Sequence, residues 1–271
     1  MLTLPDLNYD LVVREVSSFI LSYVSSLNVN GVVIGLSGGL DSSVTADLSV
    51  KALGSSRVLG LIMPDSDITP REDVDDALNL ASILKIKHQV IDIKNIVEAY
   101  RRSVKLKGGK VAEGNLRARI RMSILYYYAN SMRMLVAGTG DRSEVMIGYF
   151  TKYGDGGADI LPIGCLYKTT VRRLASYLKL PESIVNKPSS PRLWRSHLAE
   201  EELGISYNEI DIILYGLYDL GLSSEELSRR SGIGIENIER IRRMKLLSEH
   251  KRKTPPIPQN IIDMYRRMDK S

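Results

Sequence analysis

A run of β-branched residues that leads straight into a loop of small residues constrains this chain more than any other feature. Residues 32–43 read Val-Val-Ile-Gly-Leu-Ser-Gly-Gly-Leu-Asp-Ser-Ser. The apolar start favours a buried strand. Gly38 and Gly39 carry no Cβ atom, so the neighbouring backbone amides are open to a ligand. The run from Val44 to Leu53 predicts a helix, whose first amides favour an anion. The sequence therefore predicts a strand, an anion-binding loop and a helix.

Asp41 is the only carboxylate in this loop. A carboxylate repels phosphate unless a divalent cation lies between them, so Asp41 indicates a nucleotide bound with magnesium. The loop is not a Walker A motif, because no Gly-Lys-Ser/Thr follows the glycines. The simpler alternative is a Gly-rich turn with a Ser/Asp helix cap and no ligand.

Composition places the chain among ordinary globular proteins. Its 271 residues are 44% hydrophobic and 25% charged. No stretch approaches a membrane span and no signal peptide is evident, so we expect a cytoplasmic protein that does not contact a membrane. Cys165 is the only cysteine, which excludes an intrachain disulfide and a zinc site of several thiolates. The formal charge of +5 suits a polyanionic partner.

Apolar patterning predicts alternating strands and helices. After an opening helix at 11–27, the expected strands are 31–36, 57–63, 88–93 and 134–137, and the helices between them are 41–53, one starting at 69–72, 93–103 and 114–132. This alternation is typical of an α/β fold, a doubly wound parallel sheet flanked by helices. Ligands bind such sheets at the carboxyl ends of the strands. The loops at Ser37 and at Gly138–Gly140 lie at such ends.

The second half of the chain is expected to be a binding loop followed by helices. The loop covers 151–164; helices follow at 167–180 and 181–187, a break at 188–191, and a helical part from 207 to 250. We expect a single domain over 1–271, with a nucleotide-binding core at about 1–180 and a helical C-terminal part at about 200–271.

Four further blocks narrow the prediction. They are Asn-Leu-Arg-Ala-Arg-Ile-Arg-Met at 115–122, Gly-Thr-Gly-Asp-Arg-Ser-Glu at 138–144, Phe-Thr-Lys-Tyr-Gly-Asp-Gly-Gly-Ala-Asp-Ile-Leu-Pro at 150–162, and Glu-His-Lys-Arg at 249–252. With the loop at Ser37, they resemble ammonia-dependent NAD synthetase of the archaeal type, a family of the ATP pyrophosphatase superfamily, over nearly the whole chain. The resemblance implies an adenine nucleotide alpha hydrolase-like fold and a homodimer.

The resemblance also implies roles for individual residues. It implies that Asp41 and Glu144 bind magnesium, and that these two residues and Lys168 are the catalytic residues. The residues implied for ATP are Gly35, Leu36, Ser37, Gly38, Gly39, Leu40, Asp41, Ser42, Thr139, Lys168 and Ser190. The residues implied for deamido-NAD are Arg119, Lys152, Asp159, His250 and Lys251.

Several of these residues also have a local interpretation. Glu144 stands three residues after Asp141, the spacing of a helix-capping box. Arg119 borders an apolar helix stripe and can extend its charged end from it. His250 has the alternative of a plain surface histidine. Lys168, near a helix start, has the alternative of a solvated lysine.

One segment departs from the family. After Trp194 the family has Gly-Gln-Thr-Asp-Glu, whereas this chain has Ser-His-Leu-Ala-Glu at 196–200, with Ala199 in place of the aspartate. The change bears on closure of the site and on the handling of ammonia. Segments 187–202 and 107–114 have little apolar periodicity, and we expect both to become ordered over bound ATP and deamido-NAD.

The implied reaction is amidation of deamido-NAD to NAD, the final step of NAD biosynthesis, by a ligase that releases AMP and pyrophosphate. Its partners are ATP, deamido-NAD and free ammonia, since no amidase domain is evident; no catalytic base is identified. The alternatives are another ATP pyrophosphatase, for tRNA thiolation or nucleotide amination, and a DNA-binding helix-turn-helix at 223–240. The nucleotide loop speaks against the latter, so no nucleic acid partner is expected.

Overall fold

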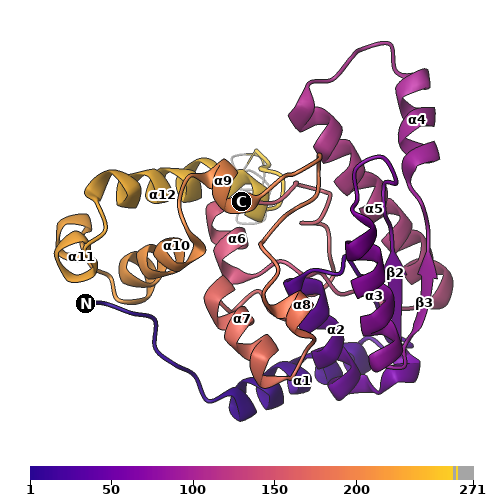
Figure 1. The fold of residues 1–271 in the computed structure, drawn as a ribbon, viewed down its shortest axis with the longest axis horizontal. Coiled ribbons are helices and arrows are strands. Elements are labelled where there is room, and N and C mark those ends of the chain that lie inside the picture. The colour runs from indigo at the N-terminus through magenta and orange to yellow at the C-terminus, as the bar shows by residue number, and fades with distance from the viewer. Residues whose placement is uncertain (259–260, 262–271) are drawn as a thin grey trace, which may run out of the picture.

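The computed structural model of the protein describes residues 1–258 and 261. The predicted helical C-terminal part runs to residue 271, and residues 259–260 and 262–271 of that prediction lie outside the described residues. A sheet with helices on both sides lies at one end of the molecule, and a group of helices extends from it toward the other end (Figure 1). No helix within the described residues is long and apolar enough to span a membrane.

Four parallel strands form the sheet in the order β3-β2-β1-β4. They are β1 (Val32–Gly35), β2 (Val58–Ile62), β3 (Lys87–Val90) and β4 (Leu135–Val136). All four predicted strands are confirmed, each shorter than predicted. The chain enters the sheet at its centre, because β1 pairs with β2 on one side and with β4 on the other. The connections therefore diverge from β1, and a crevice forms where β1 and β4 end.

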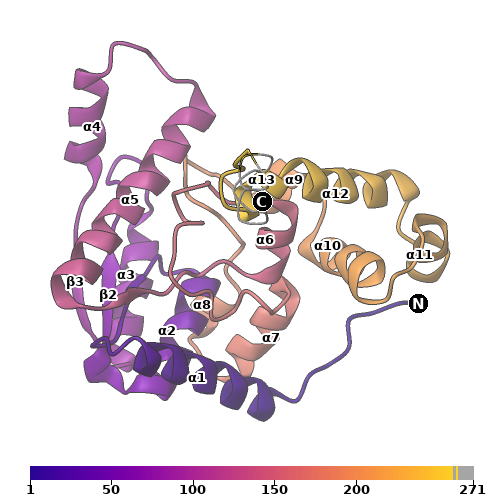
Figure 2. The ribbon, with the colours of Figure 1, turned by 180° about the vertical axis from the view of Figure 1, so that it is seen from behind.

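Helices cover both faces of the sheet, as a doubly wound fold requires (Figures 1 and 2). Val32 and Ile34 pack into a core formed with α1 (Tyr9–Ser26), α2 (Leu40–Leu53), α3 (Arg71–Ile83) and α7 (Lys168–Tyr177). Val33 faces the other way and packs with α4 (Lys94–Ser103) and α5 (Lys110–Met132). The β-branched run of β1 is thus buried on both faces, which explains why it is apolar without alternation.

The C-terminal helices form a second core. Its helices are α6 (Arg142–Ile147), α9 (Ala199–Leu203), α10 (Tyr207–Leu214), α11 (Ser224–Ser231) and α12 (Ile235–Leu247). Leu2 and Leu4 pack against this core, so the N-terminal segment lies beside the C-terminal helices (Figure 2). The helical C-terminal extension is confirmed over the described residues, and the helix-turn-helix segment at 223–240 packs into it through Leu227, Ile238 and their neighbours.

Short elements complete the chain. They are a 3-10 turn at Ser55–Arg57, α8 (Glu182–Val185), a π-helical turn at Tyr215–Asp219 and α13 (Glu249–Arg252). Helix α5 begins at Lys110, four residues before the predicted start, and α7 ends at Tyr177 rather than at 180. The predicted loop at 151–164 contains no helix or named strand; a bridge between Ala137 and Ile160 helps to join it to the end of β4.

Candidate active site

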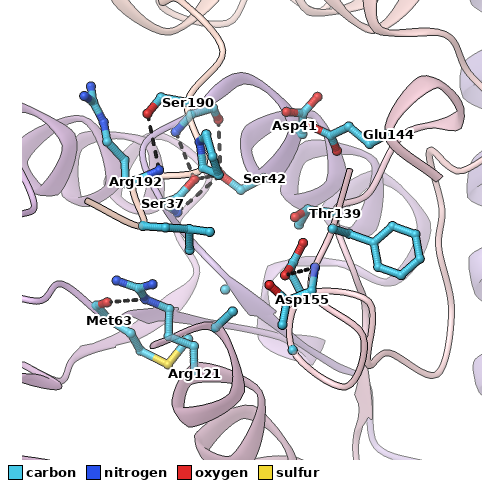
Figure 3. Close-up of a pocket in the computed structure, with 18 of the residues that line it drawn as sticks. Ser37, Asp41, Ser42, Met63, Arg121, Thr139, Glu144, Asp155, Ser190 and Arg192 are labelled. Carbon is cyan, nitrogen blue, oxygen red and sulfur yellow. Dashed lines mark hydrogen bonds between the residues drawn. The ribbon is translucent and has the colours of Figure 1, made fainter. Parts of the chain in front are cut away.

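A cavity of about 440 Å³ lies at the carboxyl ends of β1, β2 and β4, where the fold predicts a ligand. Its walls are the loop after β1, one side of α5, the turn at 148–157 and the segment 187–202. Figure 3 shows residues from all four walls facing a common space. All the residues predicted for ATP line this cavity except Gly38 and Lys168.

The loop after β1 is held open by its own serines. The Ser37 amide donates to Ser42 Oγ at 3.3 Å, and the Gly39 amide donates to Ser37 Oγ at 3.2 Å. Gly38 has φ +71°, and a Cβ atom there would lie 2.0 Å from the Asp73 carbonyl oxygen, so only glycine fits. The backbone amides of this loop lie at the N-terminus of α2, where the sequence predicts an anion-binding turn.

Three carboxylates gather beside this loop. Asp41, Asp141 and Glu144 each offer an oxygen within 4.8 Å of the others. Lys168 lies among them, with Nζ 2.7 Å from Asp41 Oδ2, 2.8 Å from Asp141 Oδ2 and 2.9 Å from Glu144 Oε1. Lys168 is only 1% exposed, so the alternative of a solvated lysine is wrong. Asp141 was not predicted as a site residue; its spacing to Glu144 suggested only a helix cap.

The electrostatics of this cluster favour a further cation. Burial raises the pKa of Asp141 to about 6, against the opposing effect of Lys168. Burial also raises the pKa of Glu144 well above its usual value. Burial by itself would lower the pKa of Lys168, but the carboxylates outweigh it and raise that pKa. Asp41 Oδ1 is buried without a hydrogen-bond partner. Three carboxylates around one ammonium group, one with an unused oxygen, fit a magnesium ion.

The structure separates the two predicted interpretations of Glu144. The Asp141 side chain accepts a hydrogen bond from the Glu144 amide at 2.8 Å, so it caps α6. The Glu144 side chain does not complete a capping box but reaches Lys168 and lies beside Asp41 (Figure 3). The helix cap is therefore Asp141, and the Glu144 carboxylate is available to a ligand.

Four of the five residues predicted for deamido-NAD lie together at the cavity rim, and only Lys251 of these four lines the cavity. The Arg119 guanidinium donates to the Lys152 carbonyl at 3.3 Å, and Lys152 Nζ donates to the His250 carbonyl at 2.7 Å. Lys251 lines the cavity and donates to the carbonyls of Gly148 and Phe150 at 2.7 and 2.8 Å. These links join α5, the turn at 150 and α13 into one basic surface.

Asp159 lies elsewhere. Its carboxylate accepts from the Val136 amide at 2.8 Å and from the Tyr126 hydroxyl at 3.1 Å. Both contacts tie the loop at 151–164 to β4 and α5. In the structure Asp159 therefore supports the cavity wall and is not among the residues that line the cavity.

Two residues that line the cavity lie within the sequence blocks described above, but no role was predicted for them. Asp155 faces the cavity, accepts from the Thr151 amide at 2.9 Å, and has its pKa raised because the surrounding protein desolvates its carboxylate (Figure 3). Arg121 donates to the Met63 carbonyl at 2.9 Å, and burial lowers its pKa to about 10. The signal that could have found them is their position: Asp155 lies three residues after Lys152 and Arg121 two residues after Arg119, each within a block that already holds an assigned residue.

The segment that departs from the family folds into the cavity wall. The His197 ring stacks on Trp194 with 3.5 Å between centroids, and its Nε2 lies 2.7 Å from Glu202 Oε2 and 3.2 Å from the Tyr149 hydroxyl. Ala199 is 1% exposed and packs in the second core. Alanine in place of the family's aspartate fits this apolar position, because a carboxylate here would be buried without a hydrogen-bond or ion-pair partner.

Fold and site together define an adenine nucleotide-binding α/β protein, with a phosphate loop at the switch point of a parallel sheet and an acidic cluster beside it. The chain belongs to the NAD synthase family, whose sequence profile matches residues 12–255.

Individual relatives agree with this membership. An NH(3)-dependent NAD(+) synthetase from Hyperthermus butylicus is 55% identical over 261 residues, which is 96% of this chain and 95% of that protein. Among solved structures, an NMN synthetase from Francisella tularensis has a TM-score of 0.83 at 36% identity, over 93% of this chain and 99% of that one. An NH3-dependent NAD synthetase from Campylobacter jejuni has a TM-score of 0.80 at 32% identity, over 93% and 99%.

Proposed function

We propose that the protein catalyses the ATP-dependent amidation of deamido-NAD to NAD with ammonia as the nitrogen donor. The observation that carries this proposal is that the loop at 37–42 contributes Asp41 to the cluster with Asp141, Glu144 and Lys168, and that this loop and Glu144 line one cavity. Loop amides beside a buried cation suit a triphosphate. Family membership supplies the substrate class, since the relatives are named NAD synthetases.

The chemistry follows from the poor reactivity of a carboxylate. Its oxygen attacks the α-phosphorus of ATP, the bond to the β-phosphate oxygen breaks, and pyrophosphate leaves from a deamido-NAD adenylate. Ammonia then attacks the acyl carbon, the bond to AMP breaks, and a proton is lost to give the amide. Pyrophosphate is retained by the loop at 37–42, and Lys168 supplies positive charge where negative charge accumulates.

Asp41 and Glu144 would hold a magnesium ion, and Asp141 stands close enough to join them. When bound, this ion supplies charge neutralisation for the triphosphate. In its absence Lys168 alone balances the carboxylates.

Deamido-NAD would bind at the basic surface formed by Arg119, Lys152, His250 and Lys251. Cationic and amide donors at this surface suit the pyrophosphate and ribose groups of deamido-NAD. A homodimer and a cytoplasmic location complete the proposal. Sedimentation of the purified protein tests the homodimer. We propose the cytoplasmic location because ATP, a substrate of the reaction, is available there.

The test is incubation with ATP, magnesium, deamido-NAD and ammonium, followed by separation of the nucleotides. We expect NAD, AMP and pyrophosphate in equal amounts, and no NAD when glutamine replaces ammonium. Formation of ADP and phosphate would contradict the proposal. A parallel incubation with nicotinate mononucleotide is required because one structural relative is an NMN synthetase. The family match disfavours tRNA thiolation and nucleotide amination.

A further inference from the structure

The segment 187–192, called the strap below, is fastened to α3 by ion pairs. Lys187 Nζ lies 3.0 Å from Asp73 Oδ1 and also contacts Asp76 Oδ2. Arg192 Nε lies 2.7 Å from the other oxygen of Asp73. The Asp73 side chain is only 5% exposed and that of Lys187 15%, so these pairs are largely shielded from water. Two cations from the strap thus meet two carboxylates from one helix.

Lys187 has a third partner that the ion pairs do not explain. Its Nζ donates to the Gly38 carbonyl at 2.8 Å, across 149 residues of sequence. An ammonium group has three hydrogen-bond donors, and here Gly38, Asp73 and Asp76 take all three. No donor remains for a phosphate, so an effect of Lys187 on ATP must pass through the loop.

The Gly38 carbonyl controls the next amide. A trans peptide is planar, so the Gly38 carbonyl and the Gly39 N–H point in opposite directions. Holding the carbonyl on Lys187 therefore fixes the direction of the Gly39 amide, which lies near Ser37 Oγ in the anion-binding turn. The contact adds to the hydrogen bond from the Gly39 amide to Ser37 Oγ, because glycines on both sides of this peptide restrict its rotation little by themselves. A rotated peptide would place a carbonyl oxygen toward the phosphate.

We propose that Lys187 is a positioning residue for the pyrophosphate loop. It fixes the Gly38–Gly39 peptide in the orientation that binds phosphate, and it couples that orientation to the docking of the strap, which carries Ser190. The inference rests on the proposed function to the extent that the loop receives the pyrophosphate part of ATP.

The experiment compares Lys187→Met with Asp76→Asn in the full-length protein. Lys187→Met removes the ion pairs with Asp73 and Asp76 and the contact with the Gly38 carbonyl, whereas Asp76→Asn removes only one of these ion pairs and leaves the contact with Gly38. Asp76 does not line the cavity. The readouts are the Kd of magnesium pyrophosphate by calorimetry, the KM of each substrate, kcat and the thermal unfolding temperature.

For Lys187→Met we expect the Kd of pyrophosphate and the KM of ATP to rise about tenfold, the size of one lost charge-assisted hydrogen bond. The KM of deamido-NAD and kcat should stay within about twofold, because the contact acts equally on bound ATP and on the transition state. Asp76→Asn should lower the unfolding temperature less, because Lys187 keeps its ion pair with Asp73, and should leave pyrophosphate binding within about twofold. Equal pyrophosphate binding by the two variants would overturn the proposal.

A second variant covers failure of Lys187→Met to fold. Lys187→Arg keeps the charge but cannot place one nitrogen among the same three acceptors. We expect an intermediate weakening of pyrophosphate binding, and a Kd indistinguishable from that of Asp76→Asn would overturn the proposal. Failure of the proposed function is separate, since it would appear as absence of NAD formation by the unaltered protein, whereas pyrophosphate binding is measured without turnover.

Discussion

The two ends of the site are built differently. At the phosphate end, which comprises the loop at 35–42, the carboxylate cluster and the strap, two lysines are buried or nearly so and each meets three oxygen acceptors. At the dinucleotide end, formed by Arg119, Lys152, His250 and Lys251, Arg119 and His250 are exposed, and the cationic side chains donate hydrogen bonds to backbone carbonyls. Charges are paired with carboxylates at the first end, whereas no ion pair among the described residues joins a cation of the second end to a carboxylate.

This difference indicates how binding energy is used. Dipoles and charges that are already oriented lose little on binding, so the phosphate end acts as a preorganised site for the departing pyrophosphate. Exposed side chains must be ordered when the ligand arrives, which costs conformational entropy. Substitutions at the phosphate end should therefore affect turnover or folding strongly, whereas those at the dinucleotide end should affect mainly substrate affinity.

The largest effect is expected for Asp41→Ala and Glu144→Ala. Each removes a carboxylate that would hold magnesium, and we expect kcat/KM to fall by about a thousandfold or more. Unfolding of the metal-free protein should change little, because Lys168 keeps two other carboxylate partners. Steady-state kinetics measure kcat/KM, and calorimetry measures the thermal unfolding of the metal-free protein. Asp75→Ala, at an exposed carboxylate on α3, is the control, and normal turnover in Glu144→Ala would make that residue structural only.

Lys168→Met should mainly destabilise the fold. It leaves Asp41, Asp141 and Glu144 without their buried cation, at a cost of about 3–5 kcal/mol. Urea unfolding of the chelator-treated protein measures this loss. Lys51→Met, which removes a half-exposed lysine paired with Asp47, should cost about 1 kcal/mol or less. Similar losses in the two variants would remove the contrast between a preorganised phosphate end and ordinary surface pairs.

The carboxylate cluster also predicts a pH dependence. The folded-state pKa of Asp141 is about 6, above its ordinary value, so the folded protein binds the extra proton. Stability of the metal-free protein should therefore fall as pH rises from about 4 through about 6. Thermal unfolding with a chelator across this range measures the fall, and added magnesium should restore stability above pH 6. A slope that is the same in Asp141→Asn would assign the effect to other groups.

At the dinucleotide end, Arg119→Ala should raise the KM of deamido-NAD about tenfold, the loss of one charge-assisted contact. The KM of ATP should stay within about twofold. The free energy of unfolding should change by less than about 0.5 kcal/mol, because Arg119 is exposed and contacts only a carbonyl. Lys85→Ala controls for the change in net charge, because Lys85 is exposed and distant in sequence from Arg119. An equal rise in both KM values would mean that the two ends are not independent.

The sequence predicted what local patterning controls. The β-branched run, the glycines and the helix start specify β1, its loop and α2, and the four strands follow from apolar runs. The contacts of Lys168 and Lys187 could not be predicted, because their partners lie up to 127 and 149 residues away. Asp141 was assigned only a capping role, since its second function depends on how α6 and α7 pack. The burial of Ala199 likewise depends on the second core.

The smallest expected effect concerns two segments that meet over the cavity. Lys110 Nζ lies 4.2 Å from the centre of the Trp194 ring, and a Cβ at Gly114 would lie 2.9 Å from Leu193 Cβ. The segments 107–114 and 187–202 therefore contact each other. Residues 187 and 192 are fastened by ion pairs, whereas residues 104–109 are exposed and form no helix or strand.

We expect hydrogen exchange to slow in both segments when ATP and deamido-NAD are bound, by a larger factor at 107–114 than in the strap, which is already anchored. Closing them together would exclude water that hydrolyses the adenylate. Trp194→Ala should uncouple the two segments, so that 107–114 loses most of its ligand-induced protection while the strap keeps its own. Exchange that is equally slow with and without ligands would show that these segments are part of the rigid wall of the cavity and do not close over it.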